Sequence, residues 1–298
     1  MNDTNRVSAV RWVLVITLLL NVAVCAAKII YGNAVNSVAV VSDGLHSLFD
    51  GFSNILGLVG MYYASNKPDE RHPYGHRKVE TVFTVFIGVM MFATCFEIFR
   101  KSYESFMSSE TTTAGGEAFV VMLVTLGVNI FVSTYEKKRG RELNSEFLIA
   151  DAGHTRSDIY VTSGVIAGLL ISRLGYPNAD PAVGVVVGLL VAWAGFKILK
   201  TTTAVLVDES TLDNSLVEKT VCSIEGVEQC HKIRSRGPGG SVFLDLHVVV
   251  NPSITVDEGH RIAHAVQECL KSKIEGVVDV VVHIEPRRDS SAVGDTIS

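Results

Sequence analysis

Long apolar runs fill roughly the first 210 positions of the chain, and a more polar, charge-rich sequence follows them. A helix needs roughly 20 apolar residues to cross a hydrocarbon core of about 30 Å. Six runs meet that length, and each predicts a membrane-spanning helix. They lie near 11–32, 36–64, 79–100, 117–137, 146–173 and 180–206. The second and fifth are the least apolar, because charged residues interrupt both.

The pattern changes after Asp208. A helix is predicted over 212–224, followed by strands at 227–236 and 242–250 that flank a Gly-Pro-Gly-Gly turn. Thr255 begins a helix with the residue order of a capping box, and 277–285 reads as a last strand. The order αββαβ predicts a small two-layer α+β domain with its helices on one face of the sheet.

These elements predict three parts of the chain. Residues 1–209 form an all-α, six-helix transmembrane transport domain, and 210–287 form a cytosolic α+β domain of ferredoxin-like, metallochaperone-like type. Residues 288–298 are polar and read as a disordered tail. The apolar run behind the N-terminus lacks a small-residue cleavage site, so it is interpreted as a retained first helix.

Basic residues in the short loops predict the orientation of the helices. Cytoplasmic loops carry the excess of Lys and Arg. Four cations follow the second segment and four follow the fourth: Lys67, Arg71, Arg77 and Lys78, then Lys137, Lys138, Arg139 and Arg141. The opposite loops hold Arg100, Lys101 and Arg173. Both termini are therefore expected in the cytoplasm.

Composition excludes two other classes of protein. The net charge is −5 and no dense basic face appears, which argues against a nucleic-acid partner. The five cysteines show no CxxC spacing, so a disulfide framework is not expected.

Two matched segments interrupt the second and fifth helices. One reads Asp43-Gly-Leu-His46-Ser-Leu-Phe-Asp50, and the other reads Asp151-Ala-Gly-His154-Thr-Arg-Ser-Asp158. Residues three, four and seven apart share one face of a helix, so each segment aligns two carboxylates and an imidazole. An ionisable group in a membrane helix costs roughly 2.5–3.5 kcal/mol on insertion scales, and a metal would explain its presence.

His46 and Asp50 with His154 and Asp158 would supply two nitrogen and two carboxylate ligands. The two helices run antiparallel in the deduced topology, so His46 would approach Asp158 and Asp50 would approach His154. Such a set suits tetrahedral Zn²⁺, and less selectively Co²⁺, Cd²⁺, Fe²⁺ or Mn²⁺. Asp43 and Asp151 lie on the same stripes and are expected to orient the histidines, the alternative being staging posts for the ion.

Two more clusters lie outside the helices. Asp69, His72 and His76, in the loop after the second helix, form either a metal site or a structural turn. In the C-terminal region, His283 and Glu285 share a strand face, and His260 and His264 share a helix face. With His247 they suggest a cytosolic metal site.

Together these motifs resemble the cation diffusion facilitator family from Val13 to Pro286. The most specific are the paired HxxxD segments, the loop His72-Pro-Tyr-Gly-His76-x-Lys78-x-Glu80 and the ending His283-Ile-Glu285-Pro286. The resemblance implies a homodimeric six-helix transporter with a cytosolic αββαβ domain, which exports divalent metal in exchange for protons.

The resemblance also implies roles for particular residues. His46, Asp50, His154 and Asp158 match the transport site, and Asp69, His72 and His76 match the loop site. The cytosolic set is His247, His260, His283 and Glu285. His264 is an extra candidate ligand, which the helix spacing adds and the resemblance does not. Lys78 and Asp208 match a charge pair that interlocks the dimer. Some bacterial relatives have Asp in place of His46 and pass a broader range of metals, and some relatives have Asp where this chain has Glu285.

The expected function is an alternating-access antiporter in the bilayer of a bacterial inner membrane, with Zn²⁺ or another divalent metal as substrate and regulator and no organic cofactor. A membrane metalloenzyme would show HExxH or clustered histidine motifs, and the sequence has none. A metal sensor or scaffold of the same fold that moves no ions remains the alternative.

Overall fold

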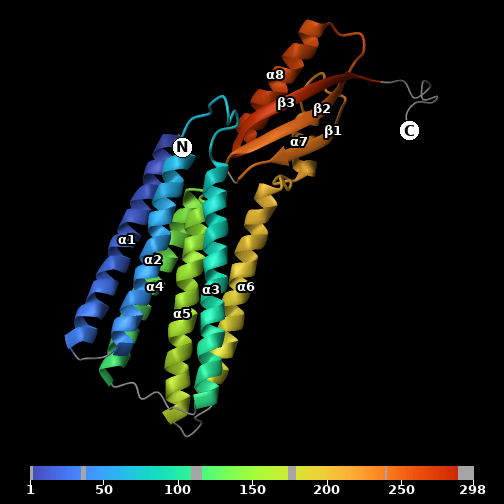
Figure 1. The fold of residues 1–298 in the computed structure, drawn as a ribbon. Helices are drawn as coiled ribbons and strands as arrows, with labels where there is room; N and C mark the ends of the chain where they lie inside the picture. Colours follow the sequence, from blue (N-terminus) through green and yellow to red (C-terminus); the bar gives the residue numbers. More distant parts are fainter. Residues whose placement is uncertain (1–2, 35–37, 109–115, 174–178, 239, 288–298) are drawn as a thin grey trace. The chain divides into compact units, whose positions relative to one another are not determined.

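A computed structural model describes residues 3–34, 38–108, 116–173, 179–238 and 240–287 of the chain (Figure 1). The chain divides into two compact units, Met1–Thr203 and Ala204–Ser298. Each unit is described by itself.

Six long helices build the first unit, as the apolar runs predict. They are α1 (Asp3–Ala34), α2 (Val38–Ala64), α3 (Lys78–Ser108), α4 (Gly116–Glu142), α5 (Glu146–Arg173) and α6 (Ala179–Leu206). Neighbours α1 and α2, and α4 and α5, pack along one another, and α2 also contacts α5. Figure 1 shows that α2 and α5 run in opposite directions.

Several helices extend beyond the apolar runs that predict them. Helix α3 continues past position 100, where Glu97 forms ion pairs with Arg100 at 2.8 Å and Lys101 at 3.7 Å. Helix α4 continues past position 137, where Arg139 pairs with Glu142 at 2.7 Å. Side chains three and four residues apart support a helix without burial, so polar sequence lengthens these helices.

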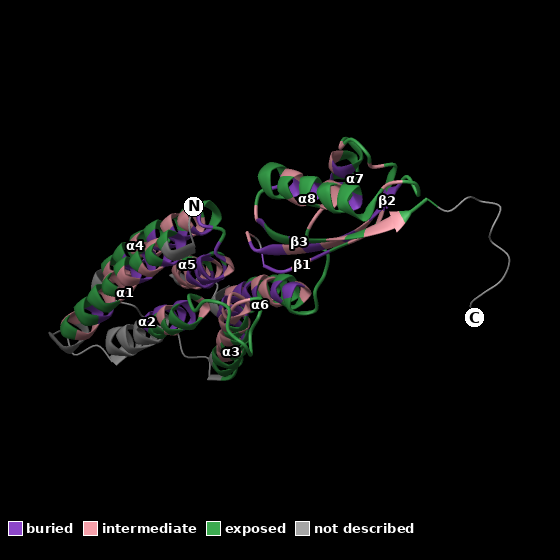
Figure 2. Ribbon diagram, turned by 90° about the horizontal axis from the view of Figure 1, so that it is seen from above, coloured by how far each residue is buried: buried purple, intermediate pink, exposed green. Residues whose placement is uncertain are grey.

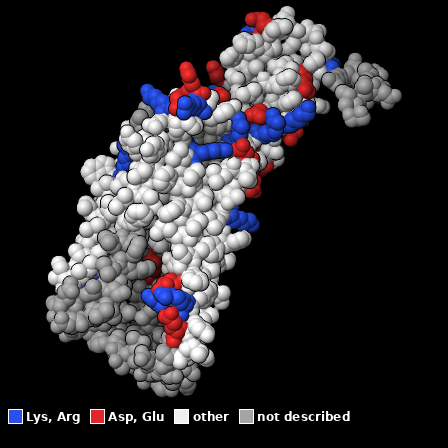
Figure 3. All heavy atoms as spheres, in the orientation of Figure 1, with Lys and Arg blue, Asp and Glu red and all other residues white. Residues whose placement is uncertain are grey.

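Four helices of the described residues are long and apolar enough to cross a membrane. These spans are Asn5–Tyr31, Lys78–Glu104, Phe119–Glu142 and Pro181–Leu206. The two others, α2 and α5, carry the charged segments. Many large apolar side chains of the bundle point outward, including Trp12, Phe96 and Trp193, each at least 65% exposed. On the face in Figure 3, charged groups gather toward the ends of the helical unit. Apolar exposure of this kind suits contact with lipid.

The second unit has the predicted order αββαβ. It contains α7 (Asn214–Cys222), β1 (Gln229–Arg236), β2 (Val242–Val250), α8 (Val256–Lys273) and β3 (Val277–Pro286). The sheet order is β1-β2-β3, with β1 antiparallel and β3 parallel to β2. Both helices lie on one side of the sheet (Figure 2). The sequence therefore predicted the fold class of both units correctly.

Alternation along β2 separates the two faces of this sheet. Leu244, Leu246 and Val248 are buried in a core that they share with residues of α7 and α8. The intervening Asp245 and His247 are only half-buried and lie on the other face. The sheet face away from the helices is thus polar and open to a ligand.

A full capping box begins α8. The hydroxyl of Thr255 accepts the Glu258 N–H at 3.2 Å, and a Glu258 carboxylate oxygen accepts the Thr255 N–H at 2.9 Å. These bonds satisfy two amides that have no partner within the helix. The Thr255 N–H also holds the pKa of Glu258 below its usual value, with the Thr255 hydroxyl adding to the effect.

Replacing Thr255 with Ala is expected to destabilise the first turn of α8 by about 1 kcal/mol. Amide hydrogen exchange in the full-length chain should then accelerate about fivefold at the start of α8. Ser272→Ala, at the far end of the same helix, serves as the control. Equal exchange rates in the wild type and Thr255→Ala would show that the cap does not stabilise this helix.

Candidate metal sites

A buried hydrogen-bond network connects the charged part of α5 to α2. Asp151 is 1% exposed. Its carboxylate accepts hydrogen bonds from the Ser53 hydroxyl at 2.9 Å and from the Asn54 amide at 3.0 Å. Each of these donors lies on α2. A buried carboxylate needs such partners, so the bonds fix α2 against α5 at this level.

The same network extends to α1. Asn54 also donates to the Thr17 hydroxyl at 3.0 Å and accepts from the Asn21 amide at 2.9 Å. Asn54 is 1% exposed and Thr17 is fully buried. Three helices are therefore tied together by polar groups, and Thr17, Asn54 and Asp151 among them are shielded from water.

Two of the predicted transport ligands have described side chains. His154 is buried, and Asp158, one turn further along α5, is half-buried. His46 and Asp50, and the supporting Asp43, lie outside the residues whose side chains the structure describes. The four-ligand site therefore stays a prediction.

Glu136 of α4 is a third acidic group in this region, and the sequence reasoning missed it. It is 1% exposed, and Asp151 and His154 are the ionisable side chains that lie near it. Among the described residues, neither of its carboxylate oxygens has a hydrogen-bond partner. It precedes the basic Lys137 and Lys138, so it reads as part of a solvated helix end. Its spacing from the buried Val132 and Ser133 is the signal that it shares their face.

The loop after α2 brings Asp69, His72 and His76 together. Asp69 oxygens lie 3.2 Å from His72 Nδ1 and 3.4 Å from His76 Nε2. All three residues offer a ligand atom within 4.8 Å of the others. The backbone N–H groups of Arg71 and His72 donate to Asp69, and the His72 bond in particular lowers the pKa of that carboxyl. A structural turn and three convergent metal donors therefore occur in the same loop.

Histidines from three strands form a row across the open face of the second unit. His231 of β1 pairs in register with His247 of β2, which pairs with His283 of β3. The ring centroids are 5.5 Å apart for the first pair and 4.6 Å for the second. Cross-strand partners project from the same face of a sheet, so the register alone aligns the three imidazoles.

Glu285 lies between these histidines. One carboxylate oxygen lies 2.7 Å from His247 Nδ1 and 3.7 Å from His283 Nε2, and the other lies 3.2 Å from His231 Nε2. The hydrogen bond to His247 is the main reason that the pKa of Glu285 falls below its usual value. His231, His247 and Glu285 offer ligand atoms within 4.8 Å of one another. Nitrogen and carboxylate donors of this kind suit Zn²⁺ and its neighbours in the first transition row.

This cluster gains one residue and does not include two that were predicted, His260 and His264. His231 joins it, although the sequence reasoning did not select that residue. A register shift between His231 and Arg234, with Lys232 at φ 50°, places His231 opposite His247. His260 lies on α8, where the centroid of its ring is 4.5 Å from that of His264. His260 and His283 both line a cavity of about 500 Å³. The roles of His260 and His264 as ligands stay predictions.

Lys78 and Asp208 belong to different units. Lys78 begins α3, and Asp208 follows α6 with φ 59°. Their interlock across a dimer also stays a prediction.

Comparison with known proteins decides the family. Residues 14–207 match the cation efflux transmembrane domain, and residues 210–287 match the cytoplasmic domain of cation efflux proteins. The chain belongs to the cation efflux family. It is therefore a multi-pass integral membrane protein of a transporter family.

Several relatives match this cation efflux protein over most of its length. An uncharacterized transporter of Methanocaldococcus jannaschii is 33% identical, over 91% of this chain and 96% of the relative. The manganese efflux system protein MneS of Bacillus subtilis is 29% identical, over 88% and 90% of the two chains. A structure of the MamM C-terminal domain is 27% identical and covers 25% of this chain and 92% of its own, with a TM-score of 0.24.

Replacing Asn54 with Leu is expected to destabilise the helical unit by about 2 kcal/mol, because Asp151 and Thr17 each lose a donor and Asn21 loses its acceptor. The melting temperature of the detergent-solubilised chain should fall. Asn66→Leu, in the exposed loop, is the matched control. An unchanged melting temperature in Asn54→Leu would contradict a stabilising role for the network.

Replacing His231 with Ala should weaken Zn²⁺ binding to the sheet cluster at least about tenfold. Loss of a residue that only orients a ligand already lowers metal affinity by about this factor, and loss of a ligand should lower it at least as much. Calorimetric titration of the full-length chain would measure this, with the other sites disabled by Asp69→Ala and His154→Ala. Lys273→Ala, at the exposed end of α8, is the control within the same unit. A loss of affinity in Lys273→Ala equal to that in His231→Ala would argue against the three-strand cluster.

Proposed function

We propose that this cation efflux protein exports a divalent transition metal from the cytoplasm, Zn²⁺ being the best match, in exchange for protons by alternating access. The proposed transport ligands are His46, Asp50, His154 and Asp158. The observation that carries the proposal is the set of hydrogen bonds from Ser53 and Asn54 to Asp151.

Those bonds define which positions of α2 and α5 lie opposite one another. Positions 53 and 54 of α2 lie opposite position 151 of α5, and the helices are antiparallel. Both helices rise by about 1.5 Å per residue, so a step back along α2 matches a step forward along α5. Position 50 is then level with position 154, and position 46 with position 158. This register supports one site formed by both segments.

The bonds also support a separate role for Asp151. Its two carboxylate oxygens already accept hydrogen bonds from α2, so Asp151 is suited to orient the site rather than to bind the metal. By the symmetry of the two motifs, Asp43 takes the equivalent role.

Proton exchange follows from the ligand types. Metal binds neutral imidazole and ionised carboxylate, so metal and protons compete for the same atoms. Histidine is suited to this exchange because its unperturbed pKa lies near 6.5. Rocking of the helices would expose the site on alternate sides of the membrane.

The remaining sites serve the same transport. The loop donors Asp69, His72 and His76 would collect metal on the cytoplasmic side. The sheet cluster of residues 210–287 would sense cytosolic metal and favour a transport-competent homodimer, which Lys78 and Asp208 interlock. In this proposal both termini face the cytoplasm of a bacterial cell, and residues 1–209 form the transport domain.

The identity of the metal can be tested by competition. The name of one relative, MneS, indicates manganese efflux. A mixed imidazole and carboxylate set favours Zn²⁺ over Mn²⁺, because Mn²⁺ prefers oxygen ligands. Zn²⁺ is therefore expected to compete more strongly than Mn²⁺ in a transport assay.

Zn²⁺ uptake into proteoliposomes should depend on a pH gradient and fall at least about tenfold in Asp158→Asn, which keeps the side-chain shape but removes the charged ligand. Asp257→Asn, on the exposed start of α8, is the control. Uptake that persists in Asp158→Asn would contradict the ligand set. Absence of uptake in wild type and variant alike would favour a metal sensor or scaffold.

A further inference from the structure

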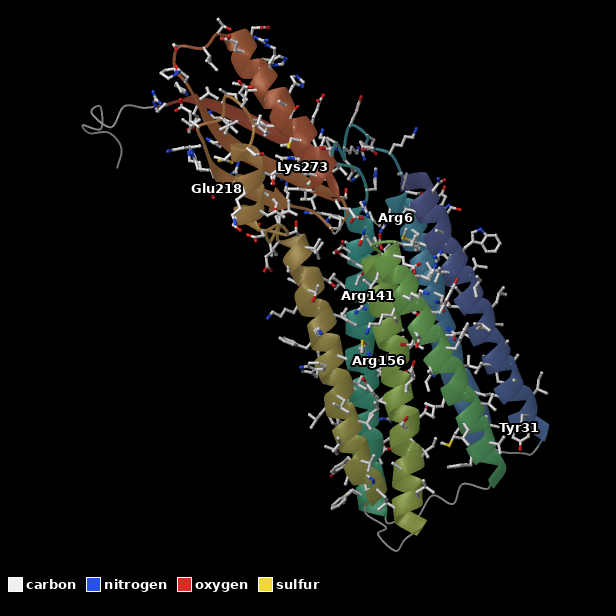
Figure 4. The ribbon with its side chains drawn as sticks, turned by 180° about the vertical axis from the view of Figure 1, so that it is seen from behind. Arg6, Tyr31, Arg141, Arg156, Glu218 and Lys273 are labelled. Carbon is white, nitrogen blue, oxygen red and sulfur yellow. The ribbon has the colours of Figure 1, made fainter. Side chains whose placement is uncertain are left out.

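A cationic groove runs between α4 and α5 on the outside of the helical unit. Its volume is about 640 Å³. Four cations line it: Lys137, Lys138 and Arg141 from α4, and Arg156 from α5. Figure 4 labels Arg141 and Arg156, which lie along the same stretch of the helical unit. The transport proposal gives none of these residues a role.

The cations of the groove have little negative charge to balance them. Glu142 is the one carboxylate in the lining, and Arg139 already pairs with it at 2.7 Å. Within the described parts of the chain, none of the four groove cations forms an ion pair with a carboxylate. Arg156, Arg141 and Lys197 are the charged neighbours of Lys137, and all three repel it. The groove therefore favours an anion from outside the chain.

Apolar side chains also line the groove. Ile130, Ile159 and Tyr160 complete this part of the lining. Ile130 precedes Lys137 by seven residues on α4, which corresponds to about 10 Å along the helix. It lies deeper in the membrane span Phe119–Glu142 and is 48% exposed. The groove thus offers cations for a charged group and apolar side chains for a hydrocarbon chain.

Arg156 links the groove to the membrane. It is exposed on α5, ten residues beyond Glu146, or about 15 Å along the helix. An arginine at this depth is costly unless a polar partner reaches it. A phospholipid phosphate in the adjoining leaflet can provide that partner, and basic pockets between membrane helices recognise such headgroups.

We propose that the groove between α4 and α5 is a binding site for an anionic phospholipid. Lys137, Arg141 and Arg156 hold the phosphodiester, and an acyl chain lies along Ile130 and Ile159. Charge complementarity and the apolar lining together favour this ligand over a soluble anion, which would use the cations alone. The site is separate from the proposed metal ligands and does not depend on the identity of the metal.

The experiment uses the full-length chain in nanodiscs that contain equal amounts of phosphatidylglycerol and phosphatidylcholine. After release into mild detergent, native mass spectrometry counts the lipids that remain bound. The wild type should retain phosphatidylglycerol in preference to phosphatidylcholine. Lys137→Gln with Arg141→Gln should reduce that retention about tenfold or more, because each cation near the headgroup adds to binding.

Two matched variants separate the specific site from general attraction. Lys67→Gln with Arg71→Gln removes two cations from the exposed loop after α2 and should leave retention unchanged. Lys137→Arg with Arg141→Lys keeps both charges and should restore retention, which excludes misfolding as the cause. Equal loss in the loop variant would show diffuse electrostatic attraction and overturn the proposal.

Two further outcomes would also overturn the proposal. If inorganic phosphate at about 10 mM, a concentration too low to screen charge contacts strongly, displaced phosphatidylglycerol from the wild type, the ligand would be a free anion. If phosphatidylcholine were retained as strongly as phosphatidylglycerol, the groove would recognise hydrocarbon alone.

Discussion

The hydrogen bonds to Asp151 are the constraint on which the helical unit depends. A carboxylate that is 1% exposed inside a bundle must be satisfied by its neighbours, and two donors come from one helix, α2. Neither helix can slide by a turn without breaking these two hydrogen bonds. The metal motif begins with Asp151 on α5 and ends just before Ser53 on α2. The constraint therefore acts at one edge of the proposed site.

A second polar contact secures the unit at the turn between α4 and α5. Arg6 of α1 pairs with Glu80 of α3 at 2.9 Å, and both side chains are less than 10% exposed. Arg6 also donates to the carbonyls of Leu143 and Asn144 at 2.7 Å and 2.9 Å. Removing one partner of such a pair leaves the other charge buried without compensation, which destabilises the fold. Two buried polar contacts, one at the turn and one beside the metal motif, thus fix how α1 to α5 can move together.

The length and pattern of the apolar runs were sufficient to predict the six helices and the αββαβ order. They could not predict where α3 and α4 end, because ion pairs rather than burial extend them. The burial of Glu136 was not predicted for a related reason. A glutamate next to two lysines reads as a surface residue, and only packing against α5 reveals that it is buried.

His231 shows a different limit of sequence reasoning. Both strands of the hairpin were recognised, and counting from the turn gives an approximate register. A single irregularity between His231 and Arg234 shifts that register and decides which face His231 occupies. The strand was predictable, but the alignment of three histidines on one face was not.

The three candidate metal sites differ in burial, and this difference has an electrostatic consequence. Asp69 and His72 are exposed, so water can solvate the loop site when it is empty. His154 and Asp151 are buried, and charges there have no such solvent. In the proposed antiport, protons would balance the carboxylates of an empty transport site, whereas an empty loop site need not bind them. Burial, more than the choice of ligands, is what would couple metal release to proton uptake at the helices and leave the exposed loop as a site of simple binding.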